Sequence, residues 1–261
     1  MASFAFFVCY KRNSRIRWSS VKQKAAIFVS KMVPSGIHLP ILKGPLKGLK
    51  WIVGAAGGDG KGLSTILNLS EQRQLDFAKR LVKRNRICFD IGANVGLYTL
   101  LFARLSKQVF AFEPLPRNIR YLSGHLEING IKNAIILPIA VSNSTKLLRF
   151  KEGLNCAMGK LDDVGEVPVM AISCDDFVRA YHVVPSLIKI DVEGAELEVL
   201  MGAKKLLLNH KPSILLSVHS DSLREKCLDY LAELGYDSIK PINQEYSVCA
   251  TEFAVTHGSL V

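Results

Sequence analysis

The sequence lacks the residue patterns of a zinc site and of a disulfide-stapled fold. Its six cysteines stand at positions 9, 88, 156, 174, 227 and 249 without a Cys-x-x-Cys pair, and its six histidines are not clustered. Structural zinc sites need closely spaced Cys and His ligands, and disulfide scaffolds concentrate cysteines in short secreted chains. Both classes are disfavoured, and we expect a reducing, cytoplasmic setting with Cys88 and Cys174 in the core.

Acidic residues are absent from the first 58 positions, which carry ten Lys or Arg. The rest of the chain is nearly neutral, although the net charge of the whole is +11. Obligatory binding of nucleic acid normally requires a basic stripe along the binding face. The charge pattern therefore argues against a nucleic-acid substrate and assigns the basic excess to the N-terminal segment.

The N-terminal extension, residues 1–33, has no hydrophobic run of the roughly 20 residues that span a bilayer. Apolar residues from Ile16 to Val33 recur at approximately helical spacing among lysines and arginines, so a basic amphipathic helix with peripheral membrane contact is one interpretation. A loosely ordered basic tail is the other, and we favour it. Pro and Gly are dense from 34 to 69, which predicts short strands and turns in a lid or entry segment that extends to residue 84.

Short apolar runs alternate with helical patterns from residue 85 to the end, which predicts one α/β domain with a parallel sheet. A helix from Ser70, as N-cap, to about Lys83 precedes it. The expected strands are 87–90, 108–113, 134–139, 187–191 and 213–219, and the expected helices are 96–106, 116–129, 195–209 and 221–234. Strands at about 237–241 and 245–256 would close the sheet as a hairpin. Residues 146–150 and 167–172 are typical of an inserted hairpin around a polar loop.

A glycine motif follows the first predicted strand and directly precedes a helix. It reads Asp90-Ile91-Gly92-Ala93-Asn94-Val95-Gly96. Gly92 and Gly96 permit a sharp turn and a close approach to a ligand, and the helix N-terminus offers free N–H groups. Glu113 ends the next strand, where an acid can bind both hydroxyls of a ribose. The combination indicates a nucleoside-containing cofactor rather than a tight turn alone.

A dinucleotide-binding site is disfavoured by the same motif. The dinucleotide fingerprint is Gly-x-Gly-x-x-Gly, but Asn94 and Leu97 occupy its second and third glycine positions. Asp90, two residues before Gly92, would repel a pyrophosphate and favour a ligand with an ammonium and a sulfonium. Among the possible functions, a nicotinamide-dependent oxidoreductase therefore ranks third. A non-catalytic nucleoside-binding module ranks second, behind an enzyme that uses a nucleoside-containing cofactor.

Six stretches resemble the FkbM-type methyltransferases. They are residues 89–96, 111–114, 129–130, 140–142, 189–196 and 217–219. The resemblance implies S-adenosylmethionine as cofactor, a Rossmann-like class I sheet of seven strands with a reversed final strand, and O-methylation of a hydroxyl on a sugar, glycolipid or other small molecule. It leaves the acceptor open, because the insert 151–166 varies widely in such proteins. The expected cofactor-binding residues are Asp90, Gly92, Ala93, Asn94, Gly96, Glu113, Pro114, Ala140 and Val141.

Asp191 and Glu193 stand at the carboxyl end of the fourth predicted strand, where open α/β sheets hold their ligands. Their spacing gives both the same facing, and His219, at the end of the neighbouring strand, can transfer protons near neutral pH. We predict these three as the catalytic residues, with one as general base. Glu196 is interpreted as compensating the helix dipole. A version in which the three ligate a divalent cation ranks below a metal-free one.

Overall fold

The structure, a computed structural model, describes residues 33–55, 62–68, 71–151, 160–161, 167–242 and 251–258. The predicted amphipathic helix, Ser70, most of the polar insert and the first part of the last strand lie outside these residues. Within the described part of the chain, none of the helices has the length and apolar character needed to cross a membrane.

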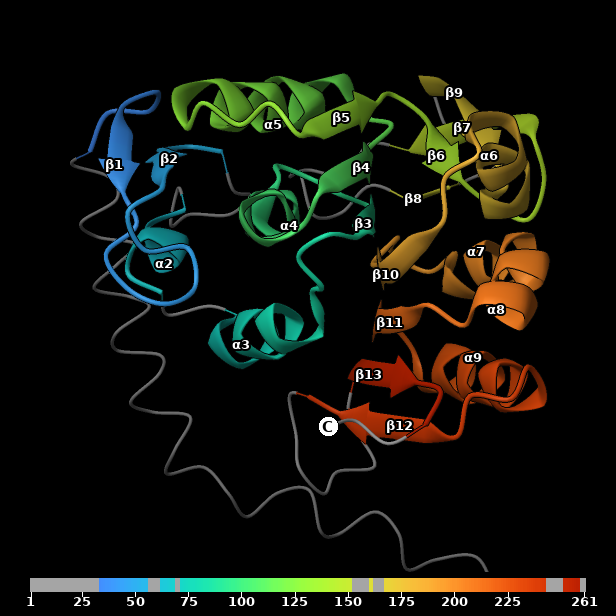
Figure 1. Ribbon diagram of the computed structural model, residues 1–261. Coiled ribbons are helices and arrows are strands. Elements are labelled where there is room, and N and C mark those ends of the chain that lie inside the picture. The colour runs from blue at the N-terminus through green and yellow to red at the C-terminus, as the bar shows by residue number, and fades with distance from the viewer. Residues whose placement is uncertain are drawn as a thin grey trace, which may run out of the picture.

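A seven-stranded sheet forms the centre of the molecule (Figure 1). Its strands are β3 (Ile87–Ile91), β4 (Gln108–Phe112), β5 (Ala134–Leu137), β10 (Pro185–Ile190), β11 (Ser213–Ser217), β12 (Ser238–Pro241) and β13 (Glu252–Thr256). They lie in the order β12-β13-β11-β10-β3-β4-β5, and β13 is antiparallel to both of its neighbours. The predicted reversed final strand is therefore confirmed. β3 and β10 are parallel neighbours, but the order of the strands reverses between them: β4 and β5 lie on one side of β3, and β10 and β11 lie on the other. Open α/β sheets bind ligands at such a switch point.

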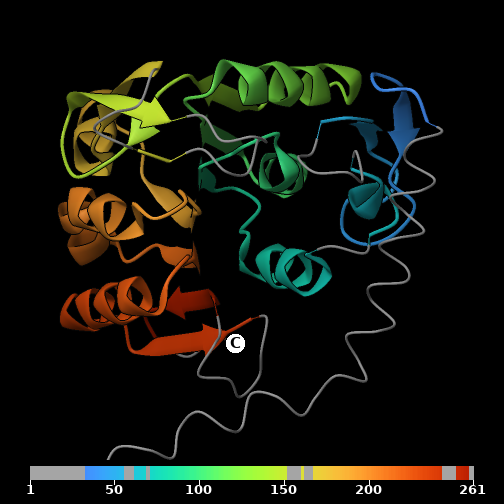
Figure 2. The same ribbon diagram turned by 180° about the vertical axis from the view of Figure 1, so that it is seen from behind.

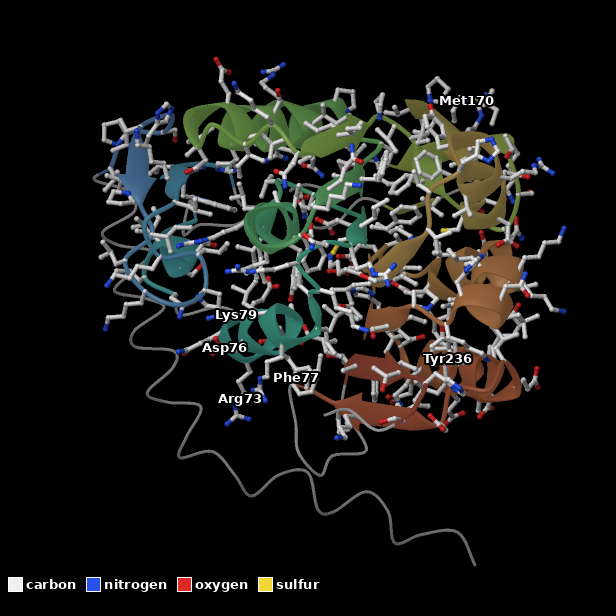
Figure 3. The ribbon with its side chains drawn as sticks, in the orientation of Figure 1. Arg73, Asp76, Phe77, Lys79, Met170 and Tyr236 are labelled. Atoms are coloured by element: carbon white, nitrogen blue, oxygen red, sulfur yellow. The ribbon has the colours of Figure 1, made fainter. Side chains whose placement is uncertain are left out.

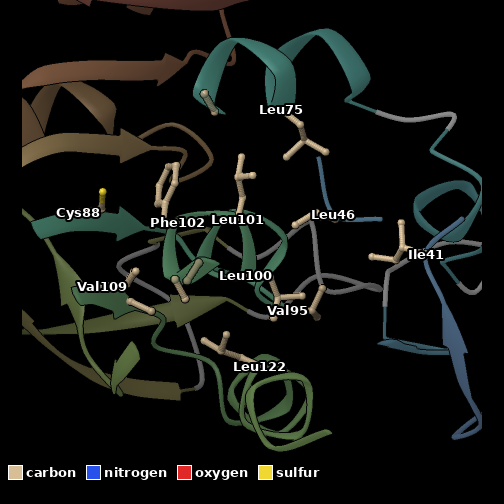
Figure 4. Packing of buried hydrophobic residues seen from close by; sticks show 14 of the residues in the cluster. Ile41, Leu46, Leu75, Cys88, Val95, Leu100, Leu101, Phe102, Val109 and Leu122 are labelled. Carbon is tan, nitrogen blue, oxygen red and sulfur yellow. The ribbon is translucent and has the colours of Figure 1, made fainter. Parts of the chain in front are cut away.

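Helices cover both faces of this sheet (Figures 1 and 2). On one face lie α3 (Gln72–Leu81), α4 (Leu97–Leu105) and α5 (Pro116–Ile128), and on the other α6 (Cys174–Tyr181), α7 (Glu196–Gly202), α8 (Lys204–His210) and α9 (Asp221–Glu233). Leu100, Leu101 and Phe102 of α4 are fully buried in the first core layer (Figure 4). Phe177 of α6 is the centre of an aromatic cluster in the second.

The entry segment packs on the first of these faces. Its elements are β1 (His38–Pro40), β2 (Lys50–Ile52) and α2 (Leu63–Ile66), and β1 and β2 pair antiparallel. The short strands were predicted from the Pro- and Gly-rich composition, whereas the one-turn helix α2 was not. Trp51 stacks on the His125 ring at 4.1 Å between ring centroids, and the Ile52 N–H donates to His125 Nε2 at 2.9 Å. His125 is therefore a core residue that attaches this segment to α5.

The predicted inserted hairpin belongs to a separate four-stranded sheet. Its strands are β6 (Ala140–Val141), β7 (Lys146–Lys151), β8 (Lys160–Leu161) and β9 (Val167–Ile172), in the order β6-β9-β7-β8. β7 and β9 are antiparallel, with Leu147 opposite Met170, and both side chains are exposed. Figure 3 shows Met170 at the surface. The same figure shows Arg73, Asp76 and Lys79 on the outer side of α3.

Three local details differ from the sequence-based expectations. The predicted helix 195–209 is two helices, α7 and α8, separated at Ala203 directly after Gly202. The N-cap of α3 is Glu71. α6 was not predicted, although the Ser173 hydroxyl accepts the Asp176 N–H at 3.0 Å, an N-cap that the sequence Ser-x-x-Asp could have indicated.

Candidate active site

The glycine motif forms the loop between β3 and α4. Gly92 has a φ of 75°, and a Cβ at this position would lie 1.9 Å from the Asp191 carbonyl oxygen. Gly96 has a φ of 100°, and a Cβ there would lie 2.5 Å from Leu122 Cδ1. Both positions favour glycine for conformation, and at Gly92 the nearby backbone carbonyl also leaves no space for a side chain. The close approach at Gly92 places the loop directly against the end of β10.

Asp90 is fully buried below this loop. Its Oδ2 accepts the Thr99 hydroxyl at 2.5 Å, which fixes the loop to α4. Its Oδ1 has no hydrogen-bond partner and lies 4.0 Å from Lys189 Nζ. Burial raises the pKa of Asp90, an effect that Lys189 and Thr99 reduce. One carboxylate oxygen therefore has Lys189 as an ion-pair partner but receives no hydrogen bond.

Glu113 lies at the end of β4 and faces the same loop. Its Oε2 accepts the Asn94 N–H at 2.8 Å, and its Oε1 accepts the Leu115 N–H at 2.9 Å. Burial raises the pKa of this carboxyl, and the two N–H donors oppose the rise. Asn94 adopts the left-handed conformation, with φ 51°, and its buried Oδ1 has no partner. The predicted nucleoside corner is therefore assembled from two strand ends.

The remaining predicted cofactor residues contribute less directly. Ala93 is buried in the core layer beneath α4, and Pro114 directly follows Glu113. Ala140 packs in a small cluster with Leu115, whereas the Val141 side chain belongs to the second core layer. A cofactor contact at 140–141 would therefore involve the backbone, and it stays a prediction.

The three predicted catalytic side chains come together beyond β10 and β11. His219 Nε2 lies 3.5 Å from Asp191 Oδ1 and 3.4 Å from Glu193 Oε2. One donor atom from each lies within 4.8 Å of the others, so the group could also hold a divalent cation. Glu193 has a φ of 53°, a conformation that is rare for residues other than glycine and is often found at functional sites.

Glu196 has a role that the sequence interpretation missed. The side chain is fully buried, and its Oε1 accepts the Gly194 N–H at 3.1 Å and lies 2.8 Å from His219 Nδ1. Nδ1–H therefore donates to Glu196, and Nε2 is directed toward Asp191 and Glu193. Glu196 orients the histidine, and its interpretation as a helix-dipole charge alone was wrong. No local pattern indicated this contact, because Glu196 begins α7 whereas His219 lies in the loop after β11, 23 positions along the chain.

The charges of this cluster determine which groups are ionised. The hydrogen bond with Glu196 raises the pKa of His219 to about 9, with further contributions from Glu193 and Asp191 that outweigh the effect of burial. Burial alone would raise the pKa of Asp191, but Lys189 and His219 outweigh it and lower the pKa. Burial raises the pKa of Glu193. At neutral pH His219 is therefore an imidazolium, and Glu193 is the stronger base of the two acids.

Lys189 connects the cofactor loop to the catalytic acids. This buried lysine lies with Nζ 3.1 Å from Asp191 Oδ2, 3.3 Å from the Gly92 carbonyl oxygen and 4.9 Å from the Tyr98 ring centroid. Burial alone would lower the pKa of Lys189, but Asp191 and Asp90 outweigh it and raise the pKa. Sequence reasoning treated Lys189 only as part of a motif.

Comparison with known proteins shows the family to which the chain belongs. The methyltransferase FkbM domain matches residues 90–238, which contain the glycine motif, Glu113 and the catalytic cluster. The chain belongs to the FkbM methyltransferase family. Members of this family take their methyl group from S-adenosylmethionine.

The relatives and a solved structure agree with this assignment. Hexuronic acid methyltransferase AglP of Haloferax volcanii is 32% identical over 124 residues, 46% of this chain and 51% of that protein. Methyltransferase sdnD of Sordaria araneosa is 32% identical over 158 residues, 45% of this chain and 60% of that protein. The matches thus span little more than half of these relatives. The crystal structure of methyltransferase FkbM from Methylobacillus flagellatus KT has the same fold, with a TM-score of 0.51 and 15% identity over 91% of this chain and 60% of that one.

The residues of the FkbM loop fit S-adenosylmethionine. The Oδ1 atoms of Asp90 and Asn94 are buried and receive no hydrogen bond, so each would have an unused acceptor for a ligand. Glu113, whose two oxygens each accept one backbone N–H, would have further lone pairs for ribose hydroxyls, and the missing Cβ of Gly92 keeps the loop tight against β10. These residues would hold the nucleoside beside Asp191.

A hollow of about 380 Å³ opens beside the catalytic cluster of this FkbM-family chain. Its lining residues are Glu193, Gly194, His219, Ser220, Ser222, Leu223 and Lys226. The size is within the range of small-molecule sites, roughly 300–1,000 Å³. The hollow therefore adjoins two of the three predicted catalytic residues.

The stability of the protein should depend on pH through His219. Its pKa is raised from 6.5 to about 9 in the folded chain, so the protonated ring stabilises the fold below pH 6.5 and this contribution is lost as the pH rises to about 9. We expect the Tm to fall across this window more steeply in the wild type than in His219→Gln, which does not titrate there. Thermal denaturation from about pH 6 to 10 measures both slopes. Equal slopes would contradict the contact with Glu196.

Proposed function

We propose that this protein transfers a methyl group from S-adenosylmethionine to a hydroxyl oxygen of a sugar-containing acceptor. The observation that carries the proposal is the approach of two sites at one sheet edge. The nucleoside corner of Asp90 and Glu113 and the acids beyond β10 are joined by Lys189, which contacts both the Gly92 carbonyl and Asp191. The sugar class is supported by the relative named hexuronic acid methyltransferase.

S-adenosylmethionine, when bound, supplies a sulfonium-linked methyl group that a nucleophile attacks in line. Alignment should contribute much of the rate. Glu193 accepts the acceptor proton, because its raised pKa makes it the stronger base and it lines the hollow. Asp191, kept ionised by Lys189 and His219, orients the hydroxyl. The cofactor's methyl would pass to the acceptor oxygen as its bond to sulfur breaks, and the acceptor proton would go to the Glu193 carboxylate.

His219 has a supporting role in this mechanism. The sequence alone left it as one of three candidate bases. Its pKa of about 9 makes it a hydrogen-bond donor at neutral pH. Its Nε2–H faces both acids, which reduces their mutual repulsion and limits their motion. A nucleoside-binding module without catalysis would not require this constellation.

Methyl transfer should proceed without a metal ion. We expect the full chain to transfer labelled methyl from S-adenosylmethionine to a mixture of uronic acids, sugar phosphates and neutral sugars, with the rate unchanged after exhaustive treatment with EDTA. The prediction follows because Glu193 and His219 already supply a base and a compensating cation. Loss of activity in EDTA and its recovery with Mg²⁺ or Mn²⁺ would contradict the metal-free version. Absence of transfer to every sugar class would contradict the proposed acceptor.

A further inference from the structure

The hollow beside the catalytic cluster has a second wall without an assigned role. Glu193 and His219 come from the ends of β10 and β11, whereas Ser222, Leu223 and Lys226 come from the first turns of α9. The second wall offers a hydroxyl, an ammonium and a short apolar surface. This combination suits a sugar ring, whose hydroxyls form hydrogen bonds while its C–H face packs on an apolar side chain.

The charge of this wall is concentrated at Lys226. Arg224, two residues before Lys226 on α9, forms an ion pair with Asp221 at 2.8 Å. Across the residues that the structure describes, Lys226 has no carboxylate within 4.0 Å. The hollow therefore has acids at the methyl-transfer end and an available ammonium on the α9 wall.

We propose that this hollow is the acceptor subsite and that Lys226 selects acceptors that carry an anionic group, a carboxylate or a phosphate. The inference rests on the proposed function and specifies its substrate class. Asp191 and Glu193 would repel an anionic group at the reacting position, so the anionic group binds Lys226 and a hydroxyl faces Glu193. The product is then a methyl ether, even when the acceptor carries a carboxylate.

Binding measurements on the full chain, saturated with S-adenosylhomocysteine, test the selection. D-glucuronate and D-glucose 1-phosphate should bind about ten-fold more tightly than D-glucose, the usual effect of one charge-assisted hydrogen bond. The separate glucuronate and phosphate arms show which anion is preferred. Lys226→Met should remove the discrimination and Lys226→Arg should retain it. Lys132→Met, an exposed lysine between α5 and β5, is the matched control and should leave it unchanged.

A wrong role for Lys226 can be distinguished from a wrong proposed function. Titration of S-adenosylhomocysteine into the same samples shows first that the cofactor site is intact. Equal affinity for glucose and both anionic sugars, undiminished discrimination in Lys226→Met, or no binding of either anionic sugar at tens of millimolar would each overturn the role of Lys226.

The product provides an independent readout of acceptor orientation. With glucuronate and labelled S-adenosylmethionine, the transferred methyl should remain on the sugar after mild alkali, because an ether is stable and a methyl ester is hydrolysed. Release of the label by alkali would show that the carboxylate itself was methylated. That result would overturn the orientation while leaving methyl transfer intact.

Discussion

Glu193→Gln should lower kcat by about 10²–10⁴-fold, the usual contribution of a general base. The amide cannot accept a proton, but it keeps the shape of the side chain. Glu193 is about one-third exposed and lines the hollow, so the substitution should cost little stability. Affinity for S-adenosylmethionine should be unchanged, because Glu193 is not part of the nucleoside corner. Steady-state kinetics and cofactor titration measure the two quantities separately.

The control for this variant is Glu127→Gln, an exposed glutamate on α5. It should retain wild-type kcat and cofactor affinity. If Glu193→Gln kept full activity, Glu193 would not be the base, and a matching loss in Asp191→Asn would transfer that role to Asp191. A parallel loss of cofactor affinity in Glu193→Gln would instead indicate that the loop after β10 had been displaced.

Lys189→Met should destabilise the fold by about 3–5 kcal/mol, the usual result of removing one partner from a buried charge network. For a domain of this size the Tm would fall by about 6–20 °C. The substitution keeps the aliphatic stem but leaves Asp90 and Asp191 without their shared cation. Thermal or urea denaturation measures the loss, and cofactor affinity should fall with it because the Gly92 loop loses its contact.

The double variant Asp90→Asn/Lys189→Met keeps this prediction testable if the single variant folds poorly. Removing the buried acid together with the lysine should restore part of the stability, because the two effects are coupled. Strictly additive losses would contradict the network. A Tm for Lys189→Met within about 2 °C of the wild type would contradict it as well.

The sheet, and the meeting of the Gly92 loop with Glu113, could be predicted because their signals are local. Each strand is a short apolar run, and Asp90 near the end of β3 with Gly92 and Gly96 in the loop after it forms one motif whose spacing alone disfavours a dinucleotide. The position of Glu113 at the next strand end follows from the parallel topology. These inferences required only the periodicity of the chain and the rule that ligands bind at carboxyl strand ends.

The contacts that sequence reasoning missed join residues far apart in the chain. Glu196 and His219 are 23 positions apart, and His125 lies 73 positions from Ile52. Neither periodicity nor local spacing reports such pairs. The protonation of His219 was also out of reach, because its pKa depends on three carboxylates that only the fold brings together. The separation of α7 from α8 reflects tertiary packing, since a Cβ at Gly202 would lie 2.1 Å from the Ser142 carbonyl oxygen.

Isothermal titration with S-adenosylmethionine and S-adenosylhomocysteine, on the wild type and on Glu113→Gln, tests the central claim most directly. The account predicts saturable 1:1 binding of both ligands to the wild type, with affinity about ten-fold lower in the variant, whose side chain can no longer accept both ribose hydroxyls as an anion. Circular dichroism confirms that both proteins are folded. Absence of binding to the folded wild type would contradict the methyltransferase assignment of this site, and equal affinity of the two proteins would contradict the role of Glu113.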